Sequence, residues 1–184
     1  MSCPTLSIGT KLKLVRSLIL PSFDYCCDAY NDLPKYLETK LSRLLNCAIR
    51  FAYNLQRHLH ITPYRLESKL LCPKIRRLYF IACLFYTTTK NLQPKYLADL
   101  FPTFETIRRS KRTNIASSNF LLPRSNNDIF EYSFQLTAVR LWNLLPASLR
   151  NISCYNTFKS ELMEYLRLVD LNHSSNLYQA IYYC

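Results

Sequence analysis

The chain has 184 residues, of which 49% are hydrophobic and 14% aromatic, a composition too apolar for intrinsic disorder. Its 24 Lys and Arg residues against 12 Asp and Glu residues give a formal net charge of +12. Gly9 is the only glycine. This argues against Walker-type NTPases and Rossmann enzymes, whose phosphate-binding loops need glycine for positive φ and close backbone approach.

The positive charge is concentrated in the middle of the chain. Residues 1–60 carry eight Lys and Arg against four Asp and Glu, which gives +4. Residues 61–125 carry twelve against three, which gives +9, and residues 126–184 carry four against five, which gives −1. A basic region of this size favours a polyanionic partner such as RNA or DNA, and a solvated basic surface is the alternative.

The spacing of apolar residues predicts a series of helices in the first 100 residues. Proline stands at or near the start of several of them, where its missing amide hydrogen costs nothing. The first helix is expected to turn Leu14, Leu18 and Ile19 inward. The expected helices cover residues 11–20, 34–53, 62–70, 74–88 and 94–100.

Helical periodicity is lost between residues 101 and 128 and then returns. Residues 120–122 could pair with residues 129–134 as a short β-hairpin. A helix is expected from Ser133 to Pro146, with the only tryptophan, Trp142, on its apolar face. A last helix is expected over residues 154–168, with Ser153 as its N-cap.

These patterns predict a mostly α-helical protein of two small helical bundles joined by a long basic loop. A short β-hairpin near 120–134 is the one β element that we consider. The expected division is residues 1–100 as the first helical region, 101–132 as a basic linker, 133–170 as a C-terminal helical module and 171–184 as a frayed tail.

The eight cysteines form no C-x-x-C pair and have no regular spacing. Several have apolar neighbours, and a reduced cysteine behaves as a small hydrophobic residue. We therefore expect a reducing, intracellular setting, nuclear or cytoplasmic. The longest apolar run, residues 78–89, is too short to span a bilayer, so no membrane partner is expected.

Two groups of residues could bind metal, but neither pattern is convincing. Asp24, Asp28 and Asp32 recur every four residues, which spreads them over about 12 Å of helix, too far to share one ion. Asp24 would instead lie in the first turn after Pro21, where the helix dipole favours an acid. His58 and His60 lack a second ligand pair and indicate a turn before a helix. No metal site and no cofactor is predicted.

Two clusters of basic residues are candidates for contact with nucleic-acid phosphates. The run Arg108, Arg109, Lys111 and Arg112 lies in the expected loop, where it could bind phosphates, act as a nuclear localisation signal or simply be solvated. The second cluster is Arg76 and Arg77, which stand just before Tyr79 and Phe80. The two aromatic rings are expected to pack in the core and leave the arginines for the partner.

The order of several short motifs resembles the C-terminal region of non-LTR (LINE/jockey-like) retrotransposon reverse transcriptases. The most distinctive is the expected helix at 133–146, with the pattern Ser-Phe, Ala, Arg-Leu-Trp-Asn-x-Leu-Pro. Further motifs occur in the same order as in the family. They are Leu-Ile-Leu-Pro-x-Phe-Asp-Tyr-Cys at 18–26, Ala-Ile-Arg-Phe at 48–51, His-Ile-Thr-Pro at 60–63, Arg-Arg at 76–77 and Pro-Lys-Tyr-Leu at 94–97.

The resemblance implies a helical, thumb-like region over residues 11–100 that would hold a template–primer duplex, followed by a C-terminal extension. By position and charge, Lys40, Arg43, Arg50, Arg76 and Arg77 are then candidates for backbone contacts. The family's Tyr-x-Asp-Asp signature is missing, because no two acidic residues are adjacent. The catalytic carboxylates and their Mg²⁺ would belong to a palm upstream of Met1.

We therefore expect a fragment of an RNA-directed DNA polymerase, without catalytic residues of its own, that binds RNA or DNA non-specifically. Two alternatives remain. The chain could be a helical protein-interaction module, including one that docks on a separate polymerase core, or an inert pseudogene remnant.

Overall fold

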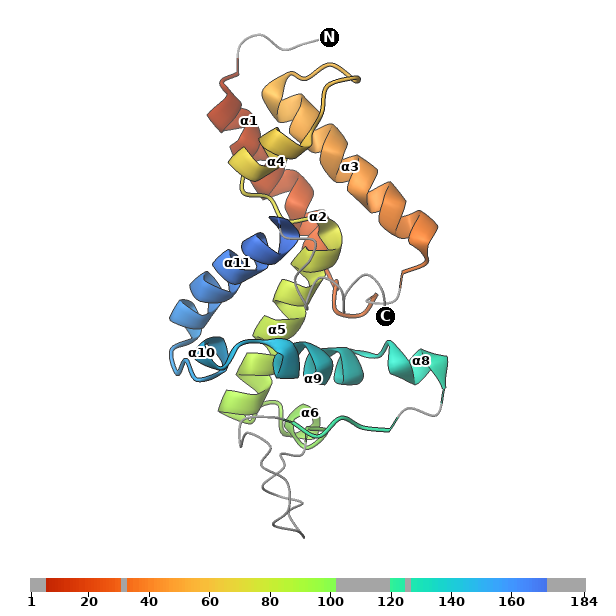
Figure 1. Cartoon of the computed structure of the whole chain (residues 1–184), viewed down its shortest axis with the longest axis vertical. Helices are drawn as coiled ribbons and strands as arrows, with labels where there is room; N and C mark the ends of the chain where they lie inside the picture. The colour runs from red at the N-terminus through yellow and green to blue at the C-terminus, as the bar shows by residue number, and fades with distance from the viewer. Residues whose placement is uncertain (1–5, 31–32, 102–119, 125–126, 172–184) are drawn as a thin grey trace. The chain divides into compact units, whose positions relative to one another are not determined.

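The computed structural model describes residues 6–30, 33–101, 120–124 and 127–171 (Figure 1). The described residues are mostly helical, as the sequence predicts. The chain divides into two compact units, Met1–Arg77 and Leu78–Cys184. The boundary expected at residue 100 therefore lies inside the second unit.

The first unit begins with three helical segments that follow one another directly. They are α1 (Ile8–Leu14), the π-helical turn η1 (Val15–Ile19) and α2 (Leu20–Asp24). Pro21 has no amide hydrogen, and its ring crowds the carbonyl four residues before it. In the wider π turn, the Leu20 amide donates to the Val15 carbonyl, five residues back. The start of a new helix at Pro21 was therefore a wrong expectation: the helical backbone continues from Ile8 to Asp24, and the π turn accommodates the proline.

The π turn also changes which side chains face the core. Lys11, Val15 and Leu20 are buried, at spacings of four and then five residues. Leu18, expected to face inward, is 68% exposed. That expectation was wrong because it extended a 3.6-residue period through a turn that contains an extra residue.

The helix α3 (Lys35–Tyr53) supplies most of the core of the first unit. It packs against α1 and η1 and buries Leu45, Ala48, Ile49 and Ala52. Its bounds match the helix expected over 34–53, with Pro34 preceding the first helical residue.

The end of α3 explains how a lysine can be buried in this unit. Asn54 ends the helix in the left-handed conformation, and its side-chain Oδ1 accepts a hydrogen bond of 2.6 Å from Lys11 Nζ. The same ammonium group lies 5.5 Å from the centre of the Phe51 ring. A polar partner and an aromatic face offset the loss of water around this charge.

Two further helices follow α3. The helix α4 (Thr62–Glu67) has Pro63 in its first turn, and His58 and His60 lie exposed before it, as the predicted turn requires. The helix begins at Thr62 itself, and its N-cap is Ile61. The long helix α5 (Pro73–Asn91) crosses the boundary between the units, because residues 73–77 belong to the first.

An aromatic cluster forms the core of the second unit. The Phe85 ring, on α5, is fully buried and contacts three other rings edge-on or tilted. Ring centres lie at 4.8 Å for Phe101, 4.9 Å for Phe120 and 5.3 Å for Trp142. Such edge-to-face pairs add to the stability gained by burying the rings.

The tryptophan helix, α9 (Phe134–Leu144), is one wall of this cluster, and α11 (Tyr155–Leu171) is another (Figure 1). Ser133 is the N-cap of α9, and its side chain accepts a hydrogen bond from the Leu136 amide. From α11, Phe158 stacks on Tyr86 with ring centres 4.3 Å apart. The Tyr86 hydroxyl donates a hydrogen bond of 2.9 Å to the carbonyl of Ile152, which lies between α10 (Ala147–Arg150) and α11.

The N-terminal cap of α11 differs from the expected Ser153. Cys154 accepts hydrogen bonds from the backbone amides of Thr157 and Asn156 and from the Thr157 hydroxyl. These hydrogen bonds, above all the one from the Thr157 amide, lower the pKa of the Cys154 thiol. A sulfur in the N-cap position satisfies helix-terminal amides in the manner of an oxygen cap.

The β-hairpin near 120–134 is not formed, because residues expected to be extended are helical. The short helix α8 (Asp128–Glu131) occupies the second half of the expected hairpin. Phe120 instead pairs with Asn143 of α9, whose Oδ1 accepts from the Phe120 amide at 3.1 Å and whose Nδ2 donates to its carbonyl at 3.0 Å. The Asn143 side-chain amide thus binds both backbone polar groups of Phe120. Most of the expected linker and the expected tail lie outside the described residues.

The helix α6 (Lys95–Ala98) follows Pro94, as expected. Among the described residues, no helix is both long enough and apolar enough to cross a membrane.

The scarcity of glycine has a conformational consequence at helix ends. Left-handed positions that usually hold glycine are occupied by Cys26 after α2, Asn54 after α3, Lys69 after α4 and Leu92 after α5. Asn tolerates this conformation, whereas Leu and Lys pay about 1–2 kcal/mol in contacts between Cβ and the backbone.

We predict that Leu92→Gly stabilises the second unit by about 0.5–1 kcal/mol, because the relief of backbone strain exceeds the added chain entropy. The measurement is urea unfolding followed by Trp142 fluorescence. Leu168→Gly is the matched control, since Leu168 is similarly exposed but lies inside α11, where glycine should cost about 1 kcal/mol. Destabilisation by both substitutions would contradict the account of Leu92.

We predict that Phe85→Ala destabilises the second unit by about 3–5 kcal/mol, because it leaves a cavity among several rings. Trp142 is the only tryptophan and lies in this unit, so its fluorescence reports the unfolding of this unit. Tyr96→Ala, at a 75% exposed ring, should change stability by less than about 0.5 kcal/mol. Equal effects of the two substitutions would show that Phe85 is not central to the core.

Candidate nucleic-acid interface

Two ion pairs join the start of α5 to the other helices of the first unit. Arg76 binds Asp24 through both carboxylate oxygens, with Nε to Oδ1 at 2.5 Å and Nη2 to Oδ2 at 2.6 Å. Arg77 pairs with Glu38 of α3, and its guanidinium also lies over the Tyr30 ring. Asp24 lies at the C-terminal end of α2, so its stabilisation comes from Arg76 and not from the helix dipole that the sequence suggested.

The two arginines differ from the other sequence candidates in their exposure. The Arg77 side chain is only 3% exposed and that of Arg76 is 19% exposed. A guanidinium that is buried and already bound to a carboxylate has little surface to offer a phosphate. The structure therefore gives these residues a role in holding the first unit together and does not support them as phosphate contacts.

Arg50 also has an internal role. Its Nη1 donates to the Gln56 carbonyl at 2.5 Å and its Nη2 to the Leu59 carbonyl at 3.1 Å. These bonds satisfy carbonyls in the segment that follows α3, which is a common use of a basic residue near a helix C-terminus. Of the residues that the resemblance singled out, Lys40 and Arg43 are the ones that are exposed.

Lys40 and Arg43 lie on one exposed face of α3. Tyr36 is 62% exposed one turn before Lys40, and the Lys40 ammonium lies 5.6 Å from the centre of its ring. Spacings of three and four residues place all three side chains on the same side of the helix. Arg108, Arg109, Lys111 and Arg112 lie outside the described residues.

The exposed charge of the first unit is almost entirely of one sign. Over its whole length this unit carries thirteen Lys and Arg against five Asp and Glu, a net charge of +8. Asp24 and Glu38 are bound to Arg76 and Arg77 in the ion pairs. Glu67 is the one exposed acid among the described residues of this unit. The exposed basic residues are Lys13, Arg16, Lys35, Lys40, Arg43, Arg57 and Lys69.

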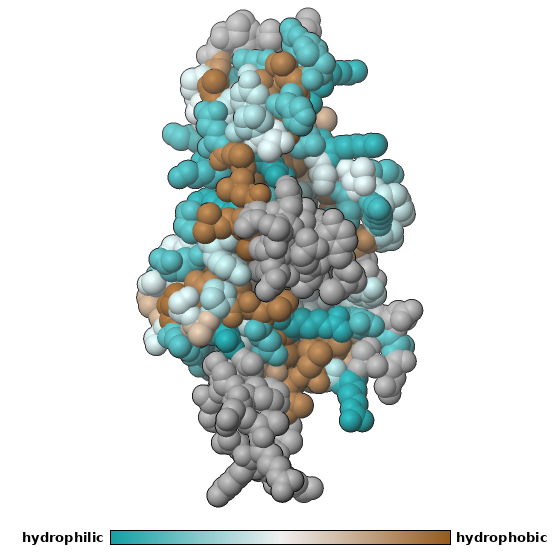
Figure 2. Space-filling model, viewed as in Figure 1, coloured by the Kyte–Doolittle hydropathy of each residue, from teal (hydrophilic) through white to brown (hydrophobic). Residues whose placement is uncertain are grey.

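The second unit has no such imbalance among its described residues. Its exposed basic residues are matched in number by exposed acids: Lys90, Lys95 and Arg124 against Asp99, Glu161 and Glu164. In the view of Figure 2, hydrophilic side chains cover much of the region of α1, α3 and α4, with apolar side chains between them. The positive field thus originates mainly from the first unit.

Sequence reasoning missed five exposed cations of this surface: Lys13, Arg16, Lys35, Arg57 and Lys69. For Lys13, Arg16, Lys35 and Arg57 the signal was the scarcity of acidic residues around them, since residues 6–23, 33–37 and 39–66 contain none. Lys69 has no such signal, because Glu67 lies two residues before it. The basic cluster most prominent in the unit, at 76–77, is the one that folding buries. Charge counts along a sequence do not separate paired from free cations.

The described part of the turn after α2, residues 25–30, places a buried cysteine beside an acid. Cys27 is buried and its Sγ lies 3.7 Å from Asp28 Oδ1, and burial raises the pKa of the thiol to about 12. Burial likewise raises the pKa of Asp28. A thiol that stays protonated is a poor metal ligand. Within the described residues, no three His, Cys, Asp or Glu side chains cluster as metal ligands would.

Comparisons of this chain with protein-family models, with curated proteins and with solved structures found no match. The geometry of the described residues is therefore the basis for the functional argument.

We predict that Arg77→Met lowers the stability of the first unit by about 3 kcal/mol, because it leaves the Glu38 carboxylate without its partner in a half-buried site. Urea unfolding followed by far-ultraviolet circular dichroism measures the loss. Adding Glu38→Gln should recover part of it, because the second change removes the unpaired charge. The affinity of the folded Arg77→Met variant for nucleic acid should stay within about twofold of the wild type, since this cation contributes little surface charge.

Proposed function

We propose that the chain binds the phosphate backbone of RNA or DNA without sequence specificity, through the exposed basic surface of the first unit. The observation that carries the proposal is the sign of the exposed charge on that unit: seven cations against Glu67 among its described residues. Phosphate contacts by Lys and Arg release counterions and supply most of the affinity of non-specific binding.

The exposed face of α3 suits such a partner. Lys40 and Arg43 are free to reach phosphates, and the Tyr36 ring beside them offers a surface on which a base could stack. The single glycine leaves no room for a glycine-rich phosphate loop, and the Tyr-x-Asp-Asp signature of a polymerase is missing.

We further propose that the chain derives from the C-terminal region of a non-LTR retrotransposon reverse transcriptase and is not an enzyme by itself. Support comes from the ordered motifs at 18–26, 48–51, 60–63, 76–77, 94–97 and 133–146, and a helical fold is compatible with a thumb-like region. Nucleotide incorporation by the purified chain on an RNA–DNA template–primer, with Mg²⁺ present, would overturn the second part of this proposal.

We predict that the double variant Lys40→Ala/Arg43→Ala binds a duplex more weakly than the wild type. Its affinity should also depend less on salt, because about two phosphate contacts are lost. The slope of log K against log salt should fall in magnitude by up to about 1.8. Fluorescence anisotropy with a labelled duplex at several salt concentrations measures it. Lys90→Ala/Lys95→Ala removes the same charge from exposed sites in the second unit and is the matched control.

The control variant should keep the wild-type slope of log K against log salt to within about 0.5, the equivalent of half a phosphate contact. Equal slopes for both double variants would remove α3 from the proposed surface. Wild-type binding that is indifferent to salt, or undetectable at low salt, would overturn the proposal itself.

A further inference from the structure

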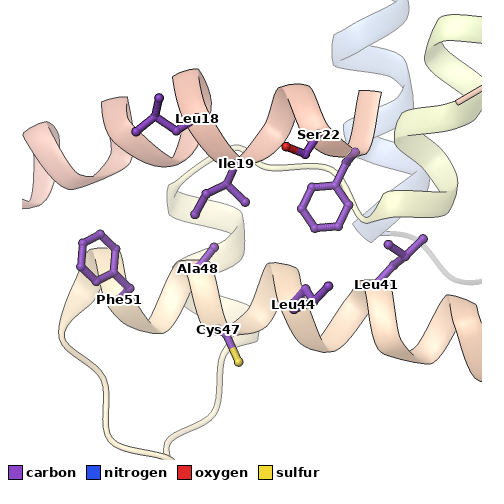
Figure 3. A pocket seen from close by; sticks show the side chains of 9 residues that line it. Leu18, Ile19, Ser22, Leu41, Leu44, Cys47, Ala48 and Phe51 are labelled. Atoms are coloured by element: carbon purple, nitrogen blue, oxygen red, sulfur yellow. The ribbon is translucent and has the colours of Figure 1, made fainter. Parts of the chain in front are cut away.

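An apolar groove runs along the first unit between α3 and the segment formed by η1 and α2 (Figure 3). Its volume is about 560 Å³. Ser22 provides the only side-chain hydroxyl of the lining, and no charged residue lines it. The apolar walls are made by Leu18, Ile19 and Phe23 on one side and by Leu41, Leu44 and Phe51 on the other.

The rim of this groove exposes large apolar side chains to solvent. Leu18 is 68% exposed, Leu44 57% and Phe51 47%. The same helix pair has its core covered elsewhere by Ile61, Tyr64 and Leu70, from α4 and the residues flanking it. No residue of α4 or α5 is among those that line the groove. Contiguous apolar surface of this kind is typical of a site that a partner covers.

The π turn η1 supplies part of one wall of the groove, through Leu18 and Ile19. It rotates Leu18 out of the core that a regular helix would have placed it in, and leaves it beside Ile19 at the groove. The exposure of Leu18 is thus a consequence of the π turn that precedes Pro21.

The charges around the groove are complementary to an acidic partner. Lys40 lies one turn before Leu44 on α3, and Arg43 lies one turn before Cys47, so both flank the lining residues. The two carboxylates of the helices that form the groove, Asp24 and Glu38, are bound to arginines of α5. An acidic ligand would therefore meet cations and no exposed acid on these helices.

The dimensions of the groove match a short helix. From Leu41 to Phe51 the lining of α3 extends about 15 Å, which is close to three helical turns. A helix with apolar side chains at positions i, i+3, i+4 and i+7 places them along about 10 Å of one face. Two roughly antiparallel helices with an apolar channel between them form the usual receptor for such a ligand.

We infer that the groove binds an acidic amphipathic helix of a partner protein, with the apolar face of that helix between η1–α2 and α3 and its acidic flank against Lys40 and Arg43. A nucleic acid suits the groove itself less well, because bases and phosphates need polar partners that the lining does not provide. The inference rests on the apolar lining, above all on Leu18 and Leu44, and it shares the cations Lys40 and Arg43 with the proposed phosphate contacts.

The test uses the full chain and a fluorescein-labelled peptide of about 14 residues with leucines at i, i+3, i+4 and i+7 and glutamates elsewhere, a length of about 21 Å when helical. Fluorescence anisotropy should show saturable binding. Leu18→Ser/Leu44→Ser should weaken it at least about tenfold, as expected for central apolar anchors. Both side chains are largely exposed, so the variant should keep the wild-type circular dichroism spectrum.

Two controls separate the groove from general stickiness. Leu168→Ser removes a leucine of similar exposure, 63%, from α11 and should leave the affinity within about twofold. A peptide with the same leucines and lysine in place of glutamate should bind at least about tenfold more weakly, because it meets like charges. Equal binding of the two peptides, or equal affinity of the two variants, would overturn the inference.

Cys47 gives a readout at the site itself. It lines the groove and is exposed, whereas Cys154 is exposed on the second unit. Bound acidic peptide should slow alkylation of Cys47 by N-ethylmaleimide, read by peptide mass spectrometry, and leave Cys154 unchanged. Binding without protection of Cys47 would place the peptide elsewhere and overturn the inference.

An oligonucleotide distinguishes this inference from the proposed function. Leu18→Ser/Leu44→Ser should leave duplex affinity within about twofold, since it changes no charge. Loss of duplex affinity in this variant, in proportion to the loss of peptide affinity, would show that nucleic acid occupies the groove and would overturn the peptide assignment. If the proposed function were wrong, duplex binding would show no salt dependence, while the acidic peptide would still bind the wild type more tightly than the Leu18→Ser/Leu44→Ser variant.

Discussion

The first unit depends on the pairing of two acids with the first turns of α5. Arg76 with Asp24 and Arg77 with Glu38 tie the ends of α2 and α3 to one helix. Desolvating these groups is costly, and pairing with good geometry is what makes the arrangement tolerable. The same pairing sets the character of the surface, because it removes two of the unit's five carboxylates from the field that a ligand would meet.

The second unit is held together by a different kind of interaction. Aromatic rings from α5, α9 and α11 meet around Phe85, and two segments distant in sequence, at Phe101 and Phe120, contribute rings to the same cluster. Burial of these rings depends on long-range contacts and little on local helix propensity. Among the described residues of this unit, exposed cations and exposed acids are equal in number.

The first unit combines a surface of mostly basic exposed residues with an apolar groove, and α3 contributes to both features. One stripe of α3 packs in the core, the adjoining stripe lines the groove through Leu44 and Phe51, and the cations Lys40 and Arg43 stand beside it. Long-range attraction by the cations would apply to any acidic partner. On the proposed functions, the groove would distinguish a phosphate backbone from an acidic helix, because an apolar face gains by burial there and a nucleic acid does not.

Much of the helical fold could be predicted from the sequence because its signals are local. Apolar periodicity located α3 over 34–53, and Ser133 with Pro146 bracketed α9. The expected helix around 11–20 was found, but its inward face was not, since a single π turn shifts every residue after it. The hairpin near 120–134 is absent because short apolar runs fit strand and helix alike, and the residues expected as its second strand include the helix α8.

The sequence by itself determined the helical class, the sites of helix initiation at prolines, the absence of glycine-dependent loops and the excess of positive charge. These follow from local backbone preferences and from composition, which need no knowledge of distant contacts. Tertiary structure alone decided which cations are available. Arg76 and Arg77 look like the strongest cluster of the unit in the sequence, yet residues 52 and 39 positions away neutralise them, while Lys40 and Arg43 stay exposed. Charge pairing and burial are properties of spatial neighbours, and only the folded chain brings those neighbours together.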